Sequence, residues 1–243
     1  MKILPIIFLT ALSLSAENAE RPVATPLPDY DIKRASSKIT LDGRLDESAW
    51  NNAGVLTLQF PWEEQTGAKQ RTTVRLLWDD DCLYLGYECA DSDIVAHFEQ
   101  RDDPTFKDDA VELFLNPNPK LKTYVGMEMN ARAVLYDYLY KFPTDHQKSY
   151  NLSGARLAAQ LDGTLNISTD TDHGWVLEVA IPLSNFVELT RGQPVSAGTI
   201  WTANLNRWDG TEPHRRLSVW SDSGLVRPSP HNPSRFGRLH FAK

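Results

Sequence analysis

Three glutamates occupy positions inside apolar segments where, in a strand, they would point away from the core. Glu112, Glu128 and Glu178 each have apolar neighbours on both sides, and successive side chains of an extended strand point to opposite faces. Two carboxyl groups about 5 to 9.5 Å apart could supply the acid and the nucleophile or base of a glycoside hydrolase. Glutamates on neighbouring strands can meet that distance by chance, so hydrolysis is one hypothesis only.

Aspartates gather in short stretches and offer the hard oxygen ligands that calcium prefers. They are Asp79, Asp80, Asp81, Asp91, Asp93, Asp102, Asp103, Asp108 and Asp109. None of these stretches has the spacing of a defined calcium-binding loop, and aspartate is common in turns. The sequence is therefore compatible with one structural calcium ion among these aspartates, but it identifies no set of ligands for it.

Period-2 apolar segments bounded by Gly, Pro, Asn and Asp recur along the chain and predict short strands. They cover residues 38–41, 55–60, 72–78, 83–89, 110–115, 124–130, 134–140, 156–161, 164–168, 175–181, 200–206, 217–220 and 236–241. Helical periodicity is confined to residues 46–51 and 183–186. Many short strands with almost no helix predict an all-β sandwich or barrel.

The alternation also predicts which side chains face the core. Trp201, Ala203 and Leu205 should point inward, whereas Asn204 and Trp208 should point the other way. Trp208 thus becomes a candidate aromatic platform, although an edge tryptophan packed under a loop would have the same phase.

The neighbouring segment 124–130 has the same pattern. Met127 and Met129 phase with the core, and Gly126, Glu128 and Asn130 lie on the opposite side. The missing side chain of Gly126 would let a ligand approach the sheet there. Outward residues that merely contact solvent would have the same pattern.

Charge and cysteine usage limit the partners and the cross-links. The formal net charge is −7 and the pI about 5.4, so nucleic acid and anionic membrane surfaces are poor partners.

Cys82 and Cys89 lie in one predicted strand, about 23 Å apart at roughly 3.3 Å per residue, which is beyond disulfide reach. We expect two buried free thiols.

The N-terminus has the order of a secretory signal. Lys2 precedes a largely apolar run over residues 3–14, and the small residues Ser15 and Ala16 follow. The run is too short to span a bilayer, which takes about 20 residues. We therefore expect a signal peptide over residues 1–16, a Pro-containing flexible leader over 17–30, one domain over 31–243, and a secreted or periplasmic location without membrane insertion.

Seven stretches in order resemble the family 9 carbohydrate-binding modules of the DOMON-like superfamily. The first three are ITLDGRLDESAW at residues 39–50, TVRLLWDDDCLYL at 73–85 and DDAVELFL at 108–115. Residues 124–137, 174–182, 204–208 and 233–239 continue the series. The resemblance covers nearly all of the chain after the leader.

This resemblance implies an antiparallel two-sheet β-sandwich, immunoglobulin-like or DOMON-like, with one or two short helices. It further implies a mono- or oligosaccharide held on an aromatic and polar face, an association with polysaccharide breakdown and often a structural calcium ion. Members are usually modules of larger enzymes, whereas no catalytic domain is evident here, so we expect a free-standing, non-enzymatic binding protein. Its oligomeric state stays open.

Sugar sites combine an aromatic platform with polar groups that hydrogen-bond hydroxyls. The candidate ligand-binding residues are Trp208, Asn204, Arg207, Glu128, Asn130, Arg101, Trp62 and Glu112. Trp62 is included because it follows Pro61 in a predicted loop, where an aromatic ring has less reason to be buried. For Arg101, surface ion pairing with nearby aspartates would explain the residue equally well. The core-phased or helix-packing tryptophans Trp50, Trp78, Trp175 and Trp201 are expected to be structural.

A third hypothesis is a haem-binding electron carrier, since some DOMON relatives hold haem between Met and His or Lys. Met127 and Met129 are the candidates, but both phase with the core and no His lies on a matching strand. Methionine in a sandwich core is usually packing.

We predict that the exported protein is cut near Ala16, because small residues follow the apolar run there. The intact mass of the exported protein measures this directly. A mature N-terminus that still carries residues 3–14 would refute the prediction.

Overall fold

The computed structural model describes residues 19–23 and 25–243. The predicted signal peptide over residues 1–16 lies outside the described residues. Within the described part, no helix is long and apolar enough to cross a membrane.

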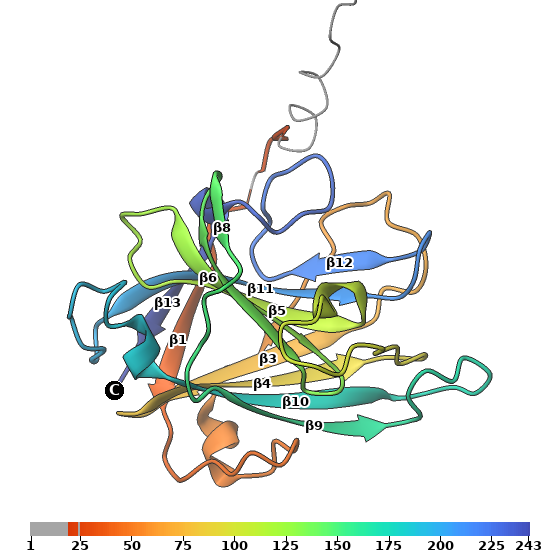
Figure 1. The fold of residues 1–243 in the computed structure, drawn as a ribbon, viewed down its shortest axis with the longest axis horizontal. Helices are drawn as coiled ribbons and strands as arrows, with labels where there is room; N and C mark the ends of the chain where they lie inside the picture. Colours follow the sequence, from red (N-terminus) through yellow and green to blue (C-terminus); the bar gives the residue numbers. More distant parts are fainter. Residues whose placement is uncertain (1–18, 24) are drawn as a thin grey trace, which may run out of the picture.

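The described chain is all-β, as predicted, with short 3-10 helices between strands (Figure 1). The strands are β1 Asp29–Arg34, β2 Leu56–Thr57, β3 Thr72–Trp78, β4 Cys82–Ala90, β5 Ala110–Asn116, β6 Thr123–Asn130, β7 Leu135–Lys141, β8 Asp145–Gln147, β9 Arg156–Asp162, β10 Gly174–Pro182, β11 Ile200–Asp209, β12 Arg216–Val219 and β13 Gly237–Phe241. The 3-10 helices are η1 Ser48–Asn52, η2 Thr105–Lys107, η3 Leu183–Phe186 and η4 Pro233–Arg235.

The strands form one curled sheet of mixed direction and not two separate antiparallel sheets. Its order is β8-β7-β6-β5-β11-β13-β1-β3-β4-β10-β9, with β12 on β11 and β2 on β3. The predicted sandwich is wrong in this respect because β1 joins the halves. Residues 29–32 pair in parallel with β13, and residues 33–34 pair in parallel with β3. Figure 1 shows β1 running between the two layers.

The main core lies between the two curled halves of the sheet. Val111, Leu113 and Met127 from the β5–β6 half share one buried cluster with Leu76 and Leu85 from the β3–β4 half. For Val111, Leu113 and Met127 this is the inward phase that the alternation predicted. A smaller aromatic cluster, built around Phe114, Tyr124 and Tyr138, covers the opposite face of β5, β6 and β7. The second face of this half is therefore covered, and the polar residues on it are buried.

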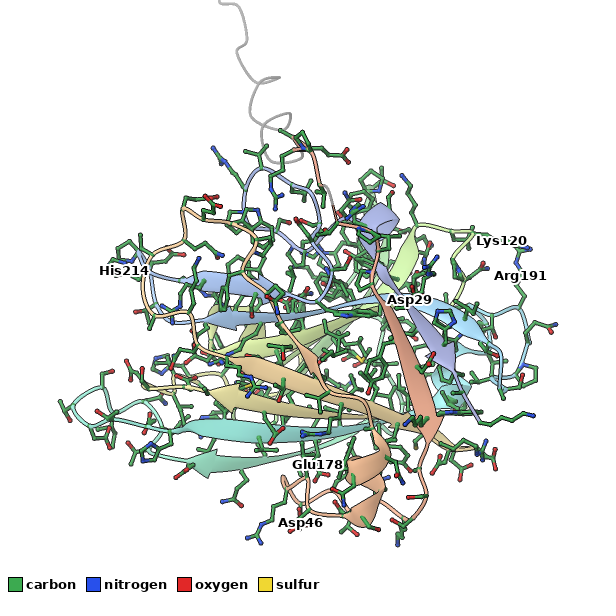
Figure 2. The ribbon with its side chains drawn as sticks, turned by 180° about the vertical axis from the view of Figure 1, so that it is seen from behind. Asp29, Asp46, Lys120, Glu178, Arg191 and His214 are labelled. Carbon is green, nitrogen blue, oxygen red and sulfur yellow. The ribbon has the colours of Figure 1, made fainter. Side chains whose placement is uncertain are left out.

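Glu178 fastens the η1 loop to the outside of β10. Its Oε2 accepts the backbone N–H groups of Asp42 and Gly43 at 2.9 Å each, and its Oε1 accepts the indole N–H of Trp50 at 3.2 Å. Figure 2 shows Glu178 beside this loop, with Asp46 at its tip. Trp50 therefore has the structural role expected of it. Both carboxylate oxygens of Glu178 are occupied by this loop, so Glu178 is not available as a catalytic carboxylate.

The described part of the predicted leader contacts the folded domain. Glu20 forms an antiparallel bridge with Leu225, and the Arg21 guanidinium pairs with Asp222 at 2.8 Å. The leader prediction also overlaps β1, which starts at Asp29.

Two predicted strands are absent, since residues 38–41 and 164–168 form loops and turns. Their apolar residues pack from loop positions: Ile39 joins the cluster around Trp50, and Leu165 lies against the main core.

The cysteine prediction is confirmed. Cys82 and Cys89 lie near opposite ends of β4, and both are buried free thiols.

Candidate functional site

A cavity of about 270 Å³ opens on the face of β5, β6 and β7 that points away from the main core. We call it the glutamate cavity; it is lined by Phe106, Glu112, Glu128, Tyr136, Tyr138, His146, Lys148, Trp208, Arg215 and His231. A larger groove of about 660 Å³ lies over β3, β4, β9 and β10, but its one aromatic residue, Trp175, is only 2% exposed. The glutamate cavity combines several aromatic rings with opposed carboxyl groups and basic side chains.

The floor of the glutamate cavity is a pair of opposed carboxyl groups. Glu112 on β5 lies directly across from Glu128 on β6 in the strand register. The amide of Asn206 donates to Glu112 Oε2 at 3.2 Å, and the Tyr138 hydroxyl donates to Glu128 Oε1 at 2.9 Å. Glu128 Oε2 is buried and has no hydrogen-bond partner within the described protein.

Burial shifts both carboxyl groups toward their protonated forms. Burial raises the pKa of Glu112 to about 7. Burial, together with the negative charge of Glu112, raises the pKa of Glu128 well above its ordinary value. At neutral pH the pair therefore keeps at least one proton. It can donate a hydrogen bond through O–H as well as accept several.

Aromatic rings form the walls. Tyr136 lies between Phe106 and Tyr138, with ring centroids 5.9 and 5.4 Å away. Tyr138 is accommodated because Gly126 has no side chain: a Cβ there would lie 2.2 Å from the Tyr138 ring. The sequence-based interpretation of Gly126 was wrong, since Tyr138 and not a ligand fills this gap.

Basic groups stand around the rim. The Arg215 guanidinium lies over the Trp208 ring, 4.9 Å from its centroid, and donates to backbone carbonyl oxygens of Phe106 and Asp108. Its Nε is buried and has no partner within the described protein. Lys148 and His146 are exposed at the mouth of the glutamate cavity.

His231 closes another side of the glutamate cavity. Its ring stacks on Phe114 at 4.8 Å, and Nδ1 lies 2.7 Å from the Tyr124 hydroxyl. Burial lowers the pKa of His231 to about 4. The imidazole is therefore neutral at pH 7.

Comparison with known proteins places this site in a family context. The family model described as "Carbohydrate family 9 binding domain-like" matches residues 41–243. The chain belongs to this family. The family is one of non-catalytic binding modules, as the sequence resemblance implied.

Solved structures show the same fold as this family 9 chain. A Bacteroides uniformis protein to which a carbohydrate-binding role has been assigned is 20% identical, with a TM-score of 0.76 over 89% of this chain and 100% of that one. A Caldicellulosiruptor kristjanssonii family 9 module in complex with cellotriose is 18% identical, with a TM-score of 0.60 over 88% and 93%. The same organism's module in complex with glucose has a TM-score of 0.57 at 18% identity over 88% and 96%. No curated protein matches the chain significantly.

Three of the candidate ligand residues of this family 9 chain meet in the glutamate cavity: Glu112, Glu128 and Trp208. Trp62 does not, because it is 1% exposed and its indole N–H donates to the Leu225 carbonyl at 2.9 Å. The expectation that its loop leaves it uncovered was wrong. Leu217 and Val219 of β12 pack on its ring.

The two candidate asparagines shape turns and loops. Asn204 exchanges two hydrogen bonds of 2.9 Å with the backbone of Ser221. Asn130 donates to Asp108 and accepts from the backbone N–H groups of Arg132 and Val134. Both side chains are buried and lie outside the cavity lining.

Arg101 lies outside the cavity lining as well. It pairs with the buried Asp137 at 2.6 Å and contacts Asn151 at 3.0 Å. Ion pairing, the alternative considered for this residue, accounts for its position.

Arg207 is 1% exposed and points into the protein, away from Trp208. Its guanidinium donates to Asp91 at 2.8 Å, to Asp209 at 2.7 Å and to the Ala90 carbonyl at 2.7 Å. The predicted ligand role was wrong because Arg207 shares the inward phase of Trp201, Ala203 and Leu205.

The acidic partners of Arg207 also bear on the calcium question. Asp91, Asp109 and Asp209 place carboxylate oxygens within 4.8 Å of one another, a spacing that could hold a cation. Arg207 already bridges Asp91 and Asp209, and Arg216 pairs with Asp209 as well. Since calcium takes 6 to 8 oxygen ligands and a guanidinium repels it, this cluster fits an ion-pair network better than a calcium site.

The residues that sequence reasoning missed come mainly from loops and from β7. Tyr136 and Tyr138 were within its reach, because they alternate on a predicted strand beside Glu128. No periodicity marks the others: Phe106 lies in η2, His146 on the short β8, and Lys148, Arg215 and His231 in loops.

We predict that Arg207→Ala lowers the free energy of unfolding by about 3 to 5 kcal/mol, because it leaves the buried Asp91 carboxylate without its cation. Arg34→Ala is the control: it removes an exposed pair with Asp80 and should cost far less. Urea unfolding measures both. Equal losses of unfolding free energy in the two variants would contradict the proposal that the buried ion pairs of Arg207 stabilise the fold.

We also predict that stability falls as pH rises from about 4.5 to 7. Between the ordinary pKa of 4.5 and the folded value of about 7 for Glu112, the folded state binds more protons than the unfolded state. The contribution of Glu112 protonation to the free energy of unfolding is complete below pH 4.5 and is lost by about pH 7. It amounts to about 3 kcal/mol at about 1.4 kcal/mol per pKa unit.

Glu112→Gln should flatten this dependence, since glutamine does not titrate. Unfolding free energies of both proteins at several pH values between 4.5 and 7.5 provide the comparison. The same slope in both proteins would show that Glu112 is ionised in the folded state.

Proposed function

We propose that this chain binds a mono- or oligosaccharide in the glutamate cavity and performs no chemistry on it. The observation that carries the proposal is the conjunction of unpartnered buried polar atoms with aromatic walls. Glu128 Oε2 and Arg215 Nε have no partner within the described protein, and both residues line the cavity with Tyr136 and Trp208. Buried polar groups are nearly always hydrogen-bonded, so these atoms favour a ligand rich in hydroxyl groups.

The aromatic rings complement those polar atoms. A sugar ring presents an apolar C–H face, which packs on aromatic rings, and hydroxyl groups that need donors and acceptors. The protonated glutamate pair supplies both kinds of hydrogen bond. Complexes of the structurally similar C. kristjanssonii modules with glucose and cellotriose support this ligand class.

Binding is favoured over hydrolysis by the family, which is one of non-catalytic binding modules. Hydrolysis would need Glu128 as the protonated acid and Glu112 as the ionised carboxylate, because Glu178 is engaged by the η1 loop. A reducing-sugar assay on oligosaccharides should show no release, and steady release would overturn the non-enzymatic proposal.

Haem binding finds no support. Met127 and Met129 are both buried in the main core between the sheet halves, where packing accounts for them.

We also propose that binding takes place outside the cytoplasm and serves polysaccharide breakdown. The signal-like order of residues 1–16 supports the location, and the family supports the carbohydrate connection.

Trp208→Ala should weaken saccharide binding about 5- to 150-fold, since stacking on an aromatic ring contributes about 1 to 3 kcal/mol in the analogous case of nucleobases. Trp208 is only partly buried, so its truncation should leave most of the stability intact. Calorimetric titration with glucose, cellobiose and cellotriose gives the affinities, and thermal melts report the fold.

Trp201→Ala is the contrasting variant. Trp201 is 1% exposed and packs against Phe186 and Phe241, so its removal should cost about 3 to 5 kcal/mol. Unchanged affinity in Trp208→Ala, or a melt as low as that of Trp201→Ala, would refute the site.

A further inference from the structure

A second hollow of about 220 Å³ adjoins the glutamate cavity. It is lined by Glu20, Lys122, Phe142, His231, Asn232 and other residues. We call it the Phe142 cavity. His231 lines both cavities, so the two hollows meet at one side chain.

The Phe142 cavity has the same mixture of groups as the glutamate cavity. Phe142 is a half-buried ring, and Glu20, Lys122 and Asn232 add a carboxylate, an ammonium group and an amide. Asn232 is held by the Ser223 carbonyl at 2.8 Å and lies 3.4 Å from Glu20 Oε1. The lining therefore offers a ring face with donors and acceptors around it.

A row of aromatic rings leads from one cavity to the other along β7. Tyr136, Tyr138 and Tyr140 alternate on one side of the strand, and Phe142 follows them just beyond its end. The Tyr140 ring lies 5.5 Å from Phe142 and 6.0 Å from His231, and both Tyr138 and Tyr140 contact the His146 ring. Four residues at about 3.3 Å each separate Tyr138 from Phe142 by roughly 13 Å, which leaves room for more than one sugar unit.

We propose that the two cavities are consecutive subsites and that the chain selects an oligosaccharide of at least two sugar units over a monosaccharide. This inference rests on the proposed function, because the first unit occupies the glutamate cavity. The second unit packs on Phe142, and its hydroxyl groups bond Lys122 and Glu20. The N-terminal segment that carries Glu20 thus forms part of the binding site.

The test measures glucose, cellobiose and cellotriose by calorimetric titration on the mature chain. Phe142→Leu keeps an apolar side chain against Tyr140 and removes the flat ring, and Lys122→Ala removes an exposed ammonium group. Each variant should lower the affinity for cellobiose and cellotriose about fivefold or more and leave the affinity for glucose unchanged. Thermal melts confirm that each variant folds.

The matched control is Lys120→Ala. Lys120, labelled in Figure 2, is exposed in the same loop. It lies outside the Phe142 cavity lining, so this variant should bind all three sugars normally. Equal affinity of the native chain for glucose and cellotriose, or an unchanged affinity for cellotriose in both cavity variants, would overturn the second subsite alone. Absence of binding to all three sugars, or normal binding by Trp208→Ala, would instead contradict the proposed function.

Discussion

The structure depends on one buried cation that crosses the core. Arg207 starts on β11 and reaches the opposite half of the sheet, where it bonds Thr72 of β3 at 3.1 Å, the Ala90 carbonyl of β4 and Asp91. Breaking such a pair is costly because it strands a buried charge, so the two halves are held at a fixed separation at this end. Side-chain alternation then obliges the next residue, Trp208, to face outward, which places the aromatic ring in the glutamate cavity.

The outer face of β5, β6 and β7 is covered in a different way from the face that lines the main core. Apolar residues fill the main core by packing alone, whereas Glu112, Glu128 and Asn206 are buried on the outer face by aromatic rings and loops. Burying polar groups there costs free energy unless hydrogen bonds replace water. Tyr138 and Asn206 supply part of that replacement, and the atoms left without partners mark where a ligand would complete it. The cavity is thus the place where buried polar atoms of Glu128 and Arg215 lack partners within the described protein.

Sequence periodicity was sufficient for most strands and failed where stability comes from distant partners. β3 and η3 were predicted at their observed bounds, because regular alternation or a preceding proline marks them. β1 was missed: only Tyr30 and Ile32 of its six residues are buried, and its pairing partners β13 and β3 are remote in sequence. The inward orientation of Arg207 could have been predicted, because it alternates with Trp201, Ala203 and Leu205. Its ion pairs with Asp91 and Asp209 could not, since no sequence spacing indicates them. The site loops carry no periodic signal at all.

The charges around the cavity differ from those of the whole chain, which is acidic. The chain carries a formal charge of −7, yet burial raises the pKa of Glu112 to about 7, favours the protonated form of Glu128 and keeps His231 uncharged. The Arg215 guanidinium is held by backbone carbonyl oxygens and the Trp208 ring, so its charge is not matched by an ionised partner in the lining. Arg215 and Lys148 give the rim a positive charge, while the floor offers O–H, N–H and carboxyl oxygen atoms. Hydroxyl groups, which donate and accept in turn, can use these atoms together, and this is why the geometry favours a sugar.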